Sequence, residues 1–209
     1  AHANAAEAEE ETKRMLEAYR DLCENTLAMP VLVGRKPEHE KFPGAVDTYC
    51  VEAMMQDGKA LQAGTSHFLG QNFAKSANIS FINNQGQSEY AYTTSWGVST
   101  RLIGGVIMTH ADDDGMVVPP KIAPYQVVIV PVIKKPEDSE AIMAYINKLA
   151  AALKTQAPFA EKIRLKIDRR DKASVDKFWE WTRKGAPVIC EIGMRDVEGN
   201  KVMVKERTK

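Results

Sequence analysis

Hydrophobic residues near the N-terminus recur at intervals of three and four positions. The recurring residues are Met15, Leu16, Tyr19, Leu22 and Cys23. This spacing predicts one amphipathic helix that extends to about Leu27. Asn4, followed by Glu7 three positions later, is a typical start signal for it.

The pattern then changes to strand-like runs separated by polar turns. Residues 45–55 and 59–69 predict two strands, and the Asp57-Gly58 pair between them strongly favours a hairpin. Residues 79–83 and 88–96 flank the polar segment NNQGQ and predict a second hairpin. Successive hairpins indicate an antiparallel sheet.

A helical period returns in residues 102–110, with Ser99 or Thr100 available as the N-cap. Gly104 and Gly105 each weaken a helix by about 1 kcal/mol relative to alanine. We therefore expect the backbone of this helix to approach the sheet closely at both glycines.

Strands and helices alternate in the second part of the chain. Strands are expected at 125–133, 163–168, 187–192 and 201–207, and helices at 137–154 and 173–183. This order predicts a compact α/β domain with a largely parallel sheet. The prolines of residues 117–124 interrupt regular structure, so we place the domain junction there and expect domains at 1–122 and 123–209.

Composition and charge narrow the classes of function. With 209 residues, 44% hydrophobic and 27% charged, the chain is typical of a globular protein. No apolar run has the length of a membrane helix and the N-terminal residues are acidic, so we expect a soluble, cytoplasmic protein without a membrane partner. The spacing of cysteines and histidines supports neither a disulfide framework nor a metal centre.

The net charge of zero hides an asymmetry. Residues 1–120 contain 9 Lys and Arg against 16 Asp and Glu, whereas residues 121–209 contain 19 against 12. The basic part is a candidate for binding nucleic acid, and an ordinary solvated surface is an equally weighted alternative.

Three segments carry a resemblance to a known family. GKALQAGTSHFLGQNFAK (58–75), TTSWGVSTRLIGGVIMTHADDDGMVVPP (93–120) and KGAPVICEIGMRD (184–196) together resemble prolyl-tRNA synthetases of the branch without an inserted editing domain. The resemblance implies part of a class II catalytic domain, an α+β fold with an antiparallel sheet. An α/β anticodon-binding domain with a mixed, largely parallel sheet would follow.

The resemblance also implies an activity. Such an enzyme joins L-proline to ATP as prolyl-adenylate, with Mg²⁺, and transfers the proline to tRNA(Pro). Its full-length form is expected to be a homodimer. Motifs one and two of class II enzymes and a further C-terminal domain would lie outside this sequence, so we interpret it as an internal fragment that is inactive alone.

The resemblance assigns the ATP site to four residues. Arg101 would contact the polyphosphate as the catalytic residue, and Ser99, Gln62 and Thr65 would also contact ATP. An arginine in the first turn of a helix suits this role, because its guanidinium and the helix N-terminus both favour anions. Gln62 would in addition be a Mg²⁺ contact.

Proline is assigned to His67 and Trp96, and the alternative for Trp96 is an ordinary core position. Strict strand alternation would place Gln62 on the opposite face from Thr65 and His67. A bend at Gly64 could bring the three together, and the sequence leaves this open.

For tRNA, the basic residues Arg169, Arg170, Lys177 and Arg195 are the candidates. The aromatic residues Phe178, Trp179 and Trp181 could stack on anticodon bases. Spacing prevents Trp179 and Trp181 from sharing one helix face, so at least one of them is expected in the core. The segment ASVDKFWEW and Met194 depart from the family pattern, which leaves the details of anticodon contact open.

Two acidic stretches have ordinary structural interpretations. Residues 112–115 lack the spacing of a calcium loop, so we expect a solvated turn there, and residues 9–11 are expected to form helical ion pairs.

The chief alternative to an enzyme is a non-catalytic tRNA- or RNA-binding paralogue with the same fold. The retained Gln62, Thr65, His67 and Arg101 favour the enzyme, and an unrelated α/β protein would require accidental motif matches.

Overall fold

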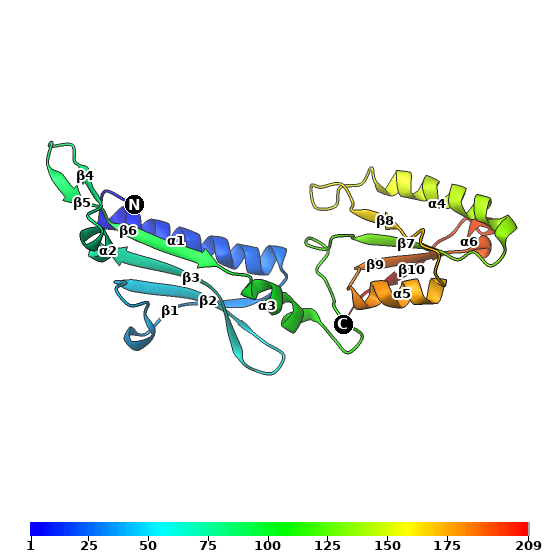
Figure 1. Cartoon of the computed structure of the whole chain (residues 1–209), viewed down its shortest axis with the longest axis horizontal. Helices are drawn as coiled ribbons and strands as arrows, with labels where there is room; N and C mark the ends of the chain where they lie inside the picture. The colour runs from blue at the N-terminus through cyan, green and yellow to red at the C-terminus, as the bar shows by residue number, and fades with distance from the viewer. Residues whose placement is uncertain (209) are drawn as a thin grey trace. The chain divides into compact units, whose positions relative to one another are not determined.

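The computed structural model describes residues 1–208 and divides the chain into two compact units, Ala1–Thr109 and His110 onward (Figure 1). Each unit has its own sheet and its own hydrophobic clusters. The junction expected from the prolines, between 122 and 123, lies 13 residues later than this division. In the structure, residues 110–122 belong to the second unit.

The first unit begins with helix α1 (Ala5–Asp21), which continues as a π-helical turn, η1 (Leu22–Thr26). Asn4 caps it as expected, because its side chain accepts a hydrogen bond of 2.9 Å from the backbone N–H of Glu7. The Glu7 carboxylate in turn accepts one from the N–H of Ala3, at 3.3 Å. The predicted helix and its start signal are confirmed.

A four-stranded antiparallel sheet lies against α1, in the order β1-β2-β3-β6. Its strands are β1 (Val31–Arg35), β2 (Asp47–Met54), β3 (Ala60–Gly70) and β6 (Thr93–Val98). The hairpin at Asp57-Gly58 is confirmed as the β2–β3 connection. The edge strand β1 was not anticipated from the sequence.

The second predicted hairpin is only half correct. Strands β4 (Ser80–Ile82) and β5 (Ser88–Tyr90) do pair, but residues 93–96 belong to β6, which pairs with β3 instead. The run 88–96 breaks because the N–H of Ala91 donates to the carbonyl of Ile79, and Tyr92 forms an isolated bridge with His2. Residue types alternate through this break as they would in one continuous strand, so the sequence pattern does not reveal it.

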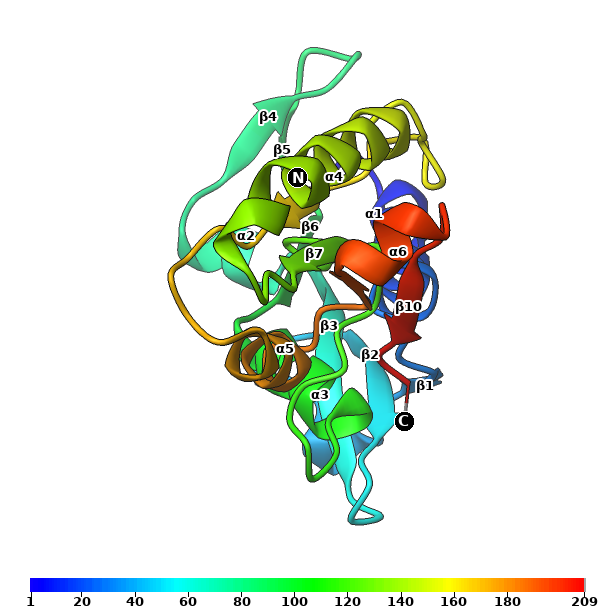
Figure 2. The same ribbon diagram turned by 90° about the vertical axis from the view of Figure 1, so that its right-hand side faces the viewer.

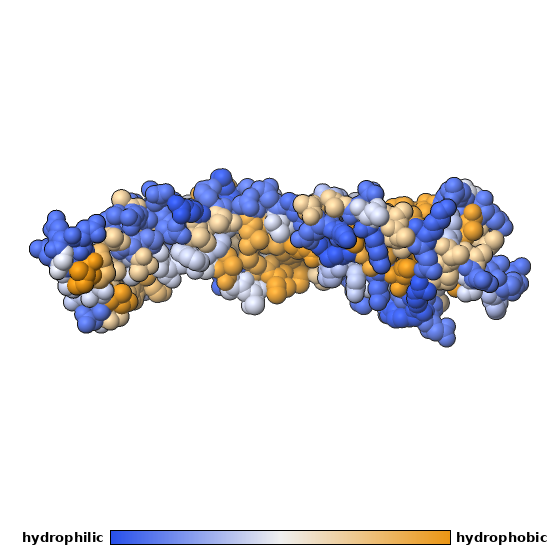
Figure 3. All heavy atoms as spheres, turned by 90° about the horizontal axis from the view of Figure 1, so that it is seen from above, coloured by the Kyte–Doolittle hydropathy of each residue, from blue (hydrophilic) through white to orange (hydrophobic). Residues whose placement is uncertain are grey.

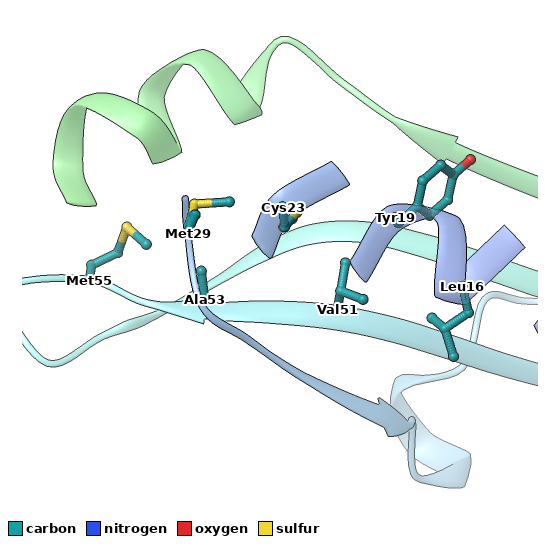
Figure 4. Close-up of a cluster of buried hydrophobic side chains, with 8 residues drawn as sticks. Leu16, Tyr19, Cys23, Met29, Val51, Ala53 and Met55 are labelled. Carbon is teal, nitrogen blue, oxygen red and sulfur yellow. The ribbon is translucent and has the colours of Figure 1, made fainter. Parts of the chain in front are cut away.

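The core of the first unit fills the space between α1 and the sheet (Figure 4). Leu16, Tyr19 and Cys23 from the helix side meet Val51 and Ala53 from β2. A buried polar contact fixes the same interface, because the Ser66 hydroxyl donates to the carbonyl of Thr12 at 2.8 Å. One face of the sheet is thereby covered by α1.

Helix α3 (Arg101–His110) follows β6, and two short helices, η2 (Glu38–Glu40) and α2 (Asn72–Ser76), lie in the connections. The expectation of close packing is confirmed at Gly105, where a Cβ would lie 3.0 Å from the side chain of Leu61. It is wrong for Gly104, where a Cβ would meet only the side chain of Met108 at 3.8 Å. Only one of the two glycines therefore faces the sheet.

The second unit contains a sheet in the order β10-β9-β7-β8. Strands β7 (Val127–Pro131), β8 (Leu165–Ile167) and β9 (Val188–Ile192) are parallel, and β10 (Met203–Glu206) is antiparallel to β9. The expected mixed, largely parallel sheet is confirmed.

Helices cover both faces of this sheet (Figures 1 and 2). Helix α4 (Ser139–Leu153), preceded by η3 (Pro136–Asp138), packs on the face that carries Ile129, and α5 (Ser174–Arg183) packs on the face that carries Val128. A short helix, α6 (Met194–Glu198), was not predicted.

Side-chain hydrogen bonds hold the start of the second unit in place. Asp112 accepts two hydrogen bonds from the guanidinium of Arg207, one of them at 2.7 Å. Arg164 donates to the backbone carbonyls of Pro120, Lys121 and Ala123. The expected solvated turn at 112–115 is therefore wrong for Asp112, whose carboxylate forms a salt bridge with an arginine that is 7% exposed.

The surface is mixed, with hydrophilic residues over much of the face drawn in Figure 3 and hydrophobic residues in separate patches. None of the helices in the described part of the chain is long and apolar enough to cross a membrane.

Candidate functional site

The candidate residues of the first unit are brought together by an irregularity in β3. Val51 of β2 lies opposite Gly64, but the next residue, Glu52, lies opposite Gln62, so Ala63 is an extra residue on β3. A bulge of this kind shifts the alternation of side chains by one position. Gln62 therefore shares a sheet face with Thr65, which resolves the question that strict alternation left open.

The register extends this face along β3. Thr65 lies opposite Cys50 and His67 opposite Thr48, and these β2 residues alternate with residues of the α1-facing core such as Val51. On the other face, Ser66 bonds to α1. Gln62, Thr65 and His67 thus line the face of the sheet that α1 does not cover.

A hollow of about 310 Å³ lies on this part of the sheet. It is lined by residues 62–65, His67, residues 95–99 and Arg101. All six residues that the sequence assigned to ATP or proline are among them. Strand β3, its neighbour β6 and the start of helix α3 therefore line the same hollow.

Arg101 is the first residue of α3, and its position is fixed from two sides. Its backbone N–H donates to the Ser99 hydroxyl at 3.3 Å, and its side-chain Nη1 donates to the carbonyl of Gln62 at 3.2 Å. The residue remains exposed. A guanidinium at the N-terminus of a helix, where the backbone dipoles also favour negative charge, can bind a polyanion.

His67 is oriented by its neighbours. Its Nδ1 shares a hydrogen bond of 3.0 Å with the Thr48 hydroxyl, and its ring lies 5.0 Å from that of Phe42. Burial, and secondly the charge of nearby Lys36, lowers the pKa of the imidazole below its ordinary value. A neutral, oriented imidazole can offer a single directed hydrogen bond to a ligand.

Trp96 is not a core residue, because it is 45% exposed. It borders the hollow, and in the β3–β6 register it lies opposite Ser66, whose hydroxyl bonds to α1. Ser95, the residue opposite His67, occupies the site-facing position instead. The assignment of Trp96 to proline stays a prediction.

Gln62 contributes an amide to the hollow, and an amide oxygen is a ligand that Mg²⁺ accepts. Among residues 1–208, no cluster of three or more His, Cys, Asp or Glu side chains could hold a metal. Mg²⁺ commonly keeps several waters and takes its remaining ligands from substrate phosphates. One amide oxygen, from Gln62, is compatible with such an ion and would not bind it alone.

The basic candidates of the second unit divide between two hollows. Arg169, Arg170 and Lys177 line a hollow of about 500 Å³ beside the carboxyl ends of β7 and β8 and the start of α5. Arg195 lines a different one of about 380 Å³, beyond the end of β9. The structure therefore groups three of the four predicted residues.

Two of these three cations, Arg169 and Lys177, differ in how exposed they are. Arg169 is exposed and donates to the side chain of Asn147 at 2.9 Å. Lys177 is only 6% exposed, and its ammonium donates to the carbonyl of Asp168 at 3.3 Å. Lys177 thus has an internal partner that the sequence did not reveal.

The two neighbouring tryptophans also separate. Trp179 is 46% exposed, whereas the partly buried Trp181 packs on the core, and its indole N–H donates to the carboxylate of Asp168 at 2.8 Å. The expectation that at least one of them belongs to the core is confirmed.

Sequence reasoning missed the acidic partners of this region. Asp168 is buried and bonds to Arg170, and Glu180 forms ion pairs with both Arg170 and Lys172. The density of basic residues in 162–172 drew attention to the cations alone. The sequence signal that could have indicated these pairs was Asp168, an acidic residue at the end of a strand within the basic run.

Comparison with known proteins agrees with this arrangement. Residues 126–209 match the family profile described as "Anticodon binding domain". A proline–tRNA ligase of Paramagnetospirillum magneticum is 57% identical over 207 residues, covering 99% of this chain and 41% of the relative. That of Erythrobacter litoralis is 56% identical over 208 residues, covering 99% and 40%.

Solved structures give the same result. A prolyl-tRNA synthetase of Cryptosporidium parvum, in complex with halofuginone and AMPPNP, superimposes with a TM-score of 0.92 and 41% identity, covering 100% of this chain and 42% of that chain. A second structure of that enzyme, with L-proline and AMP, gives 0.88 and 39%.

The second unit is therefore an anticodon-binding domain that follows an antiparallel α+β unit of the synthetase type. The chain as a whole belongs to the prolyl-tRNA synthetase family, and it spans about two fifths of the length of the relatives it matches.

Proposed function

We propose that this chain provides part of a proline–tRNA ligase, which activates L-proline with ATP and transfers it to tRNA(Pro). The observation that carries the proposal is the bulge at Ala63, which gathers Gln62, Thr65 and His67 beside Arg101. The identity to proline–tRNA ligases along nearly the whole chain supports it.

In this proposal, ATP binds across the first unit. Arg101 holds the polyphosphate, and the negative charge that develops on the pyrophosphate leaving group is stabilised by its guanidinium and by the N-terminus of α3. Ser99, Gln62 and Thr65 supply uncharged hydrogen-bonding groups, which suit ribose and phosphate oxygens. Gln62 would contact the Mg²⁺ that accompanies ATP, and this ion would supply positive charge to the phosphates.

Proline binds next to the nucleotide in the same proposal. His67, held neutral by burial and by Lys36, directs one hydrogen bond at the amino acid. Holding two reactants side by side removes much of the entropic barrier to their reaction. Trp96 is proposed to border this pocket from β6.

The second unit is proposed to bind the anticodon arm of tRNA(Pro). Arg169, Arg170 and Lys177 gather at one hollow, the exposed ring of Trp179 lies on α5, and Arg195 adds a cation at the other hollow. Cations hold phosphates, and aromatic faces stack on unpaired bases. We further propose that the complete enzyme acts in translation in the cytoplasm as a homodimer.

A segment exchange tests the proposal. The 207 matching residues of the Paramagnetospirillum magneticum ligase are replaced by this chain, and proline-dependent ATP–pyrophosphate exchange and tRNA(Pro) charging are measured. We expect both activities in the folded chimera. A folded chimera that binds tRNA but lacks both activities would support the alternative, a non-catalytic tRNA-binding paralogue.

A further inference from the structure

A buried carboxylate lies directly beneath the hollow that contains Arg170. Asp168 follows β8 and is 1% exposed, although it belongs to a loop that lines the hollow. A buried charge is stable only where charged or hydrogen-bonding partners compensate for the lost hydration. The identity of those partners shows what the residue does.

Asp168 is occupied on both carboxylate oxygens. Oδ1 accepts from the backbone N–H of Arg170 at 3.2 Å and from its Nε at 2.9 Å. Oδ2 accepts from Nη2 of Arg170 at 2.6 Å and from the indole N–H of Trp181 at 2.8 Å. The bonds to Arg170, and secondly the indole of Trp181, hold the pKa of Asp168 well below its usual range.

These contacts fix the orientation of a guanidinium. A bidentate bond through Nε and Nη2 determines the plane of the Arg170 side chain, because a guanidinium is rigid and flat. Glu180 adds an ion pair of 2.6 Å to the same Nη2. The side chain is nevertheless 48% exposed, so its remaining edge is available at the hollow.

We propose that Asp168 is a positioning residue for RNA binding, which presents the guanidinium of Arg170 to the anticodon arm in one fixed orientation. The inference rests on the proposed tRNA binding of this unit. An arginine that is already fixed loses less side-chain entropy when RNA binds than a freely rotating one.

Positioning and charge make opposite predictions for one substitution. Asp168→Asn removes a negative charge next to a polyanion site, so electrostatics alone would strengthen RNA binding. Positioning predicts weaker binding, because an amide is a poorer acceptor for the guanidinium and leaves its plane unfixed. The sign of the change in RNA affinity therefore distinguishes positioning from a pure charge effect.

The experiment uses the whole chain and a labelled anticodon stem-loop of a proline tRNA. Affinity is measured by fluorescence anisotropy for the wild type, Asp168→Asn, Arg170→Ala and the double variant. Glu198→Gln, an exposed position on α6, makes the same change in net charge and is the matched control. Circular dichroism and urea unfolding verify that each variant is folded.

We expect Asp168→Asn to weaken binding by about tenfold, and Glu198→Gln to leave it unchanged or slightly tighter. The double variant should bind no more weakly than Arg170→Ala, since Asp168 acts through Arg170. A purely structural role would instead lower affinity further in the double variant.

A second variant covers the case in which Asp168→Asn does not fold. Arg170→Lys keeps the charge but cannot form the planar two-point contact, so it should bind about as weakly as Arg170→Ala. Wild-type affinity in Arg170→Lys, or in folded Asp168→Asn, overturns the positioning role and leaves the proposed function standing. Absence of RNA binding by the wild-type chain overturns tRNA binding by this unit, and the positioning role with it.

Discussion

Gln62 and Thr65 lie on the same face of β3, although three positions separate them. Regular alternation places residues an odd number of positions apart on opposite faces. The extra residue at Ala63 shifts the alternation by one position, so Gln62 and Thr65 share a face. The geometry of the candidate ATP site depends on this single irregularity of the backbone.

Gly64→Ala should destabilise the first unit. A Cβ at Gly64 would lie 3.0 Å from Val98, 3.2 Å from Tyr19 and 3.4 Å from Val51, so the interface with α1 would be overpacked. We expect urea unfolding to give a loss of about 1–3 kcal/mol. Gly97→Ala is the control, because a Cβ there meets nothing within 4 Å, and equal losses in both variants would contradict the packing argument.

Arg101→Ala, in the chimera described above, should slow proline-dependent ATP–pyrophosphate exchange by about 10²-fold or more. The reason is the loss of one pre-oriented donor that stabilises charge on the leaving phosphate. Arg20→Ala, on the exposed last turn of α1, removes the same charge and should leave the rate unchanged. Exchange at the wild-type rate in Arg101→Ala would remove Arg101 from the site.

Lys36→Met should raise the pKa of His67. Burial lowers this pKa first, and the charge of Lys36 lowers it further, so only the second cause is removed by the substitution. The pKa is read from an NMR titration of the ring protons. Lys59→Met, an exposed lysine in the β2–β3 turn, is the control, and a titration of His67 unaffected by Lys36→Met would exclude the electrostatic cause.

Asp112→Asn should lower the stability of the second unit in a pH-dependent way. Arg207 lowers the pKa of Asp112 to about 2, below the value of 3.8 for an unperturbed group. The stabilisation is therefore complete above about pH 4 and is lost as the pH falls toward 2. Urea unfolding should show a wild-type advantage at pH 7 that shrinks across this range.

Asp113→Asn is the matched control for these unfolding measurements, because Asp113 is adjacent and exposed. The stability of this variant should follow that of the wild type at every pH. A constant difference between the wild type and Asp112→Asn down to pH 2 would argue against the ion pair.

Trp179→Ala should weaken binding of the proline anticodon stem-loop by about 1–3 kcal/mol, the usual loss when one stacked base loses its aromatic partner. The wild-type affinity should also fall steeply with salt, because phosphate contacts release counterions. Phe159→Ala is the control, since Phe159 is a comparably exposed aromatic residue of the same unit, 41% against 46%. Equal effects of the two substitutions would exclude specific stacking by Trp179.

The sequence by itself determined much of the architecture. Hydrophobic periodicity located α1, the β2–β3 hairpin, α3 and the alternating elements of the second unit, because these patterns reflect which face of each element is buried. The motif around Arg101 pointed to a family, and local chemistry offered Ser99 or Thr100 as the cap of α3. The structure selects Ser99, whose hydroxyl accepts the backbone N–H of Arg101.

Other features were decided only by tertiary structure. The bulge at Ala63, the break between β5 and β6 and the burial of Lys177 depend on partners far away in the chain. The pairing of Asp112 with Arg207 joins residues 95 positions apart. Local patterns record burial and backbone preference, whereas strand register and ion-pair partners are fixed by long-range packing that no local pattern contains.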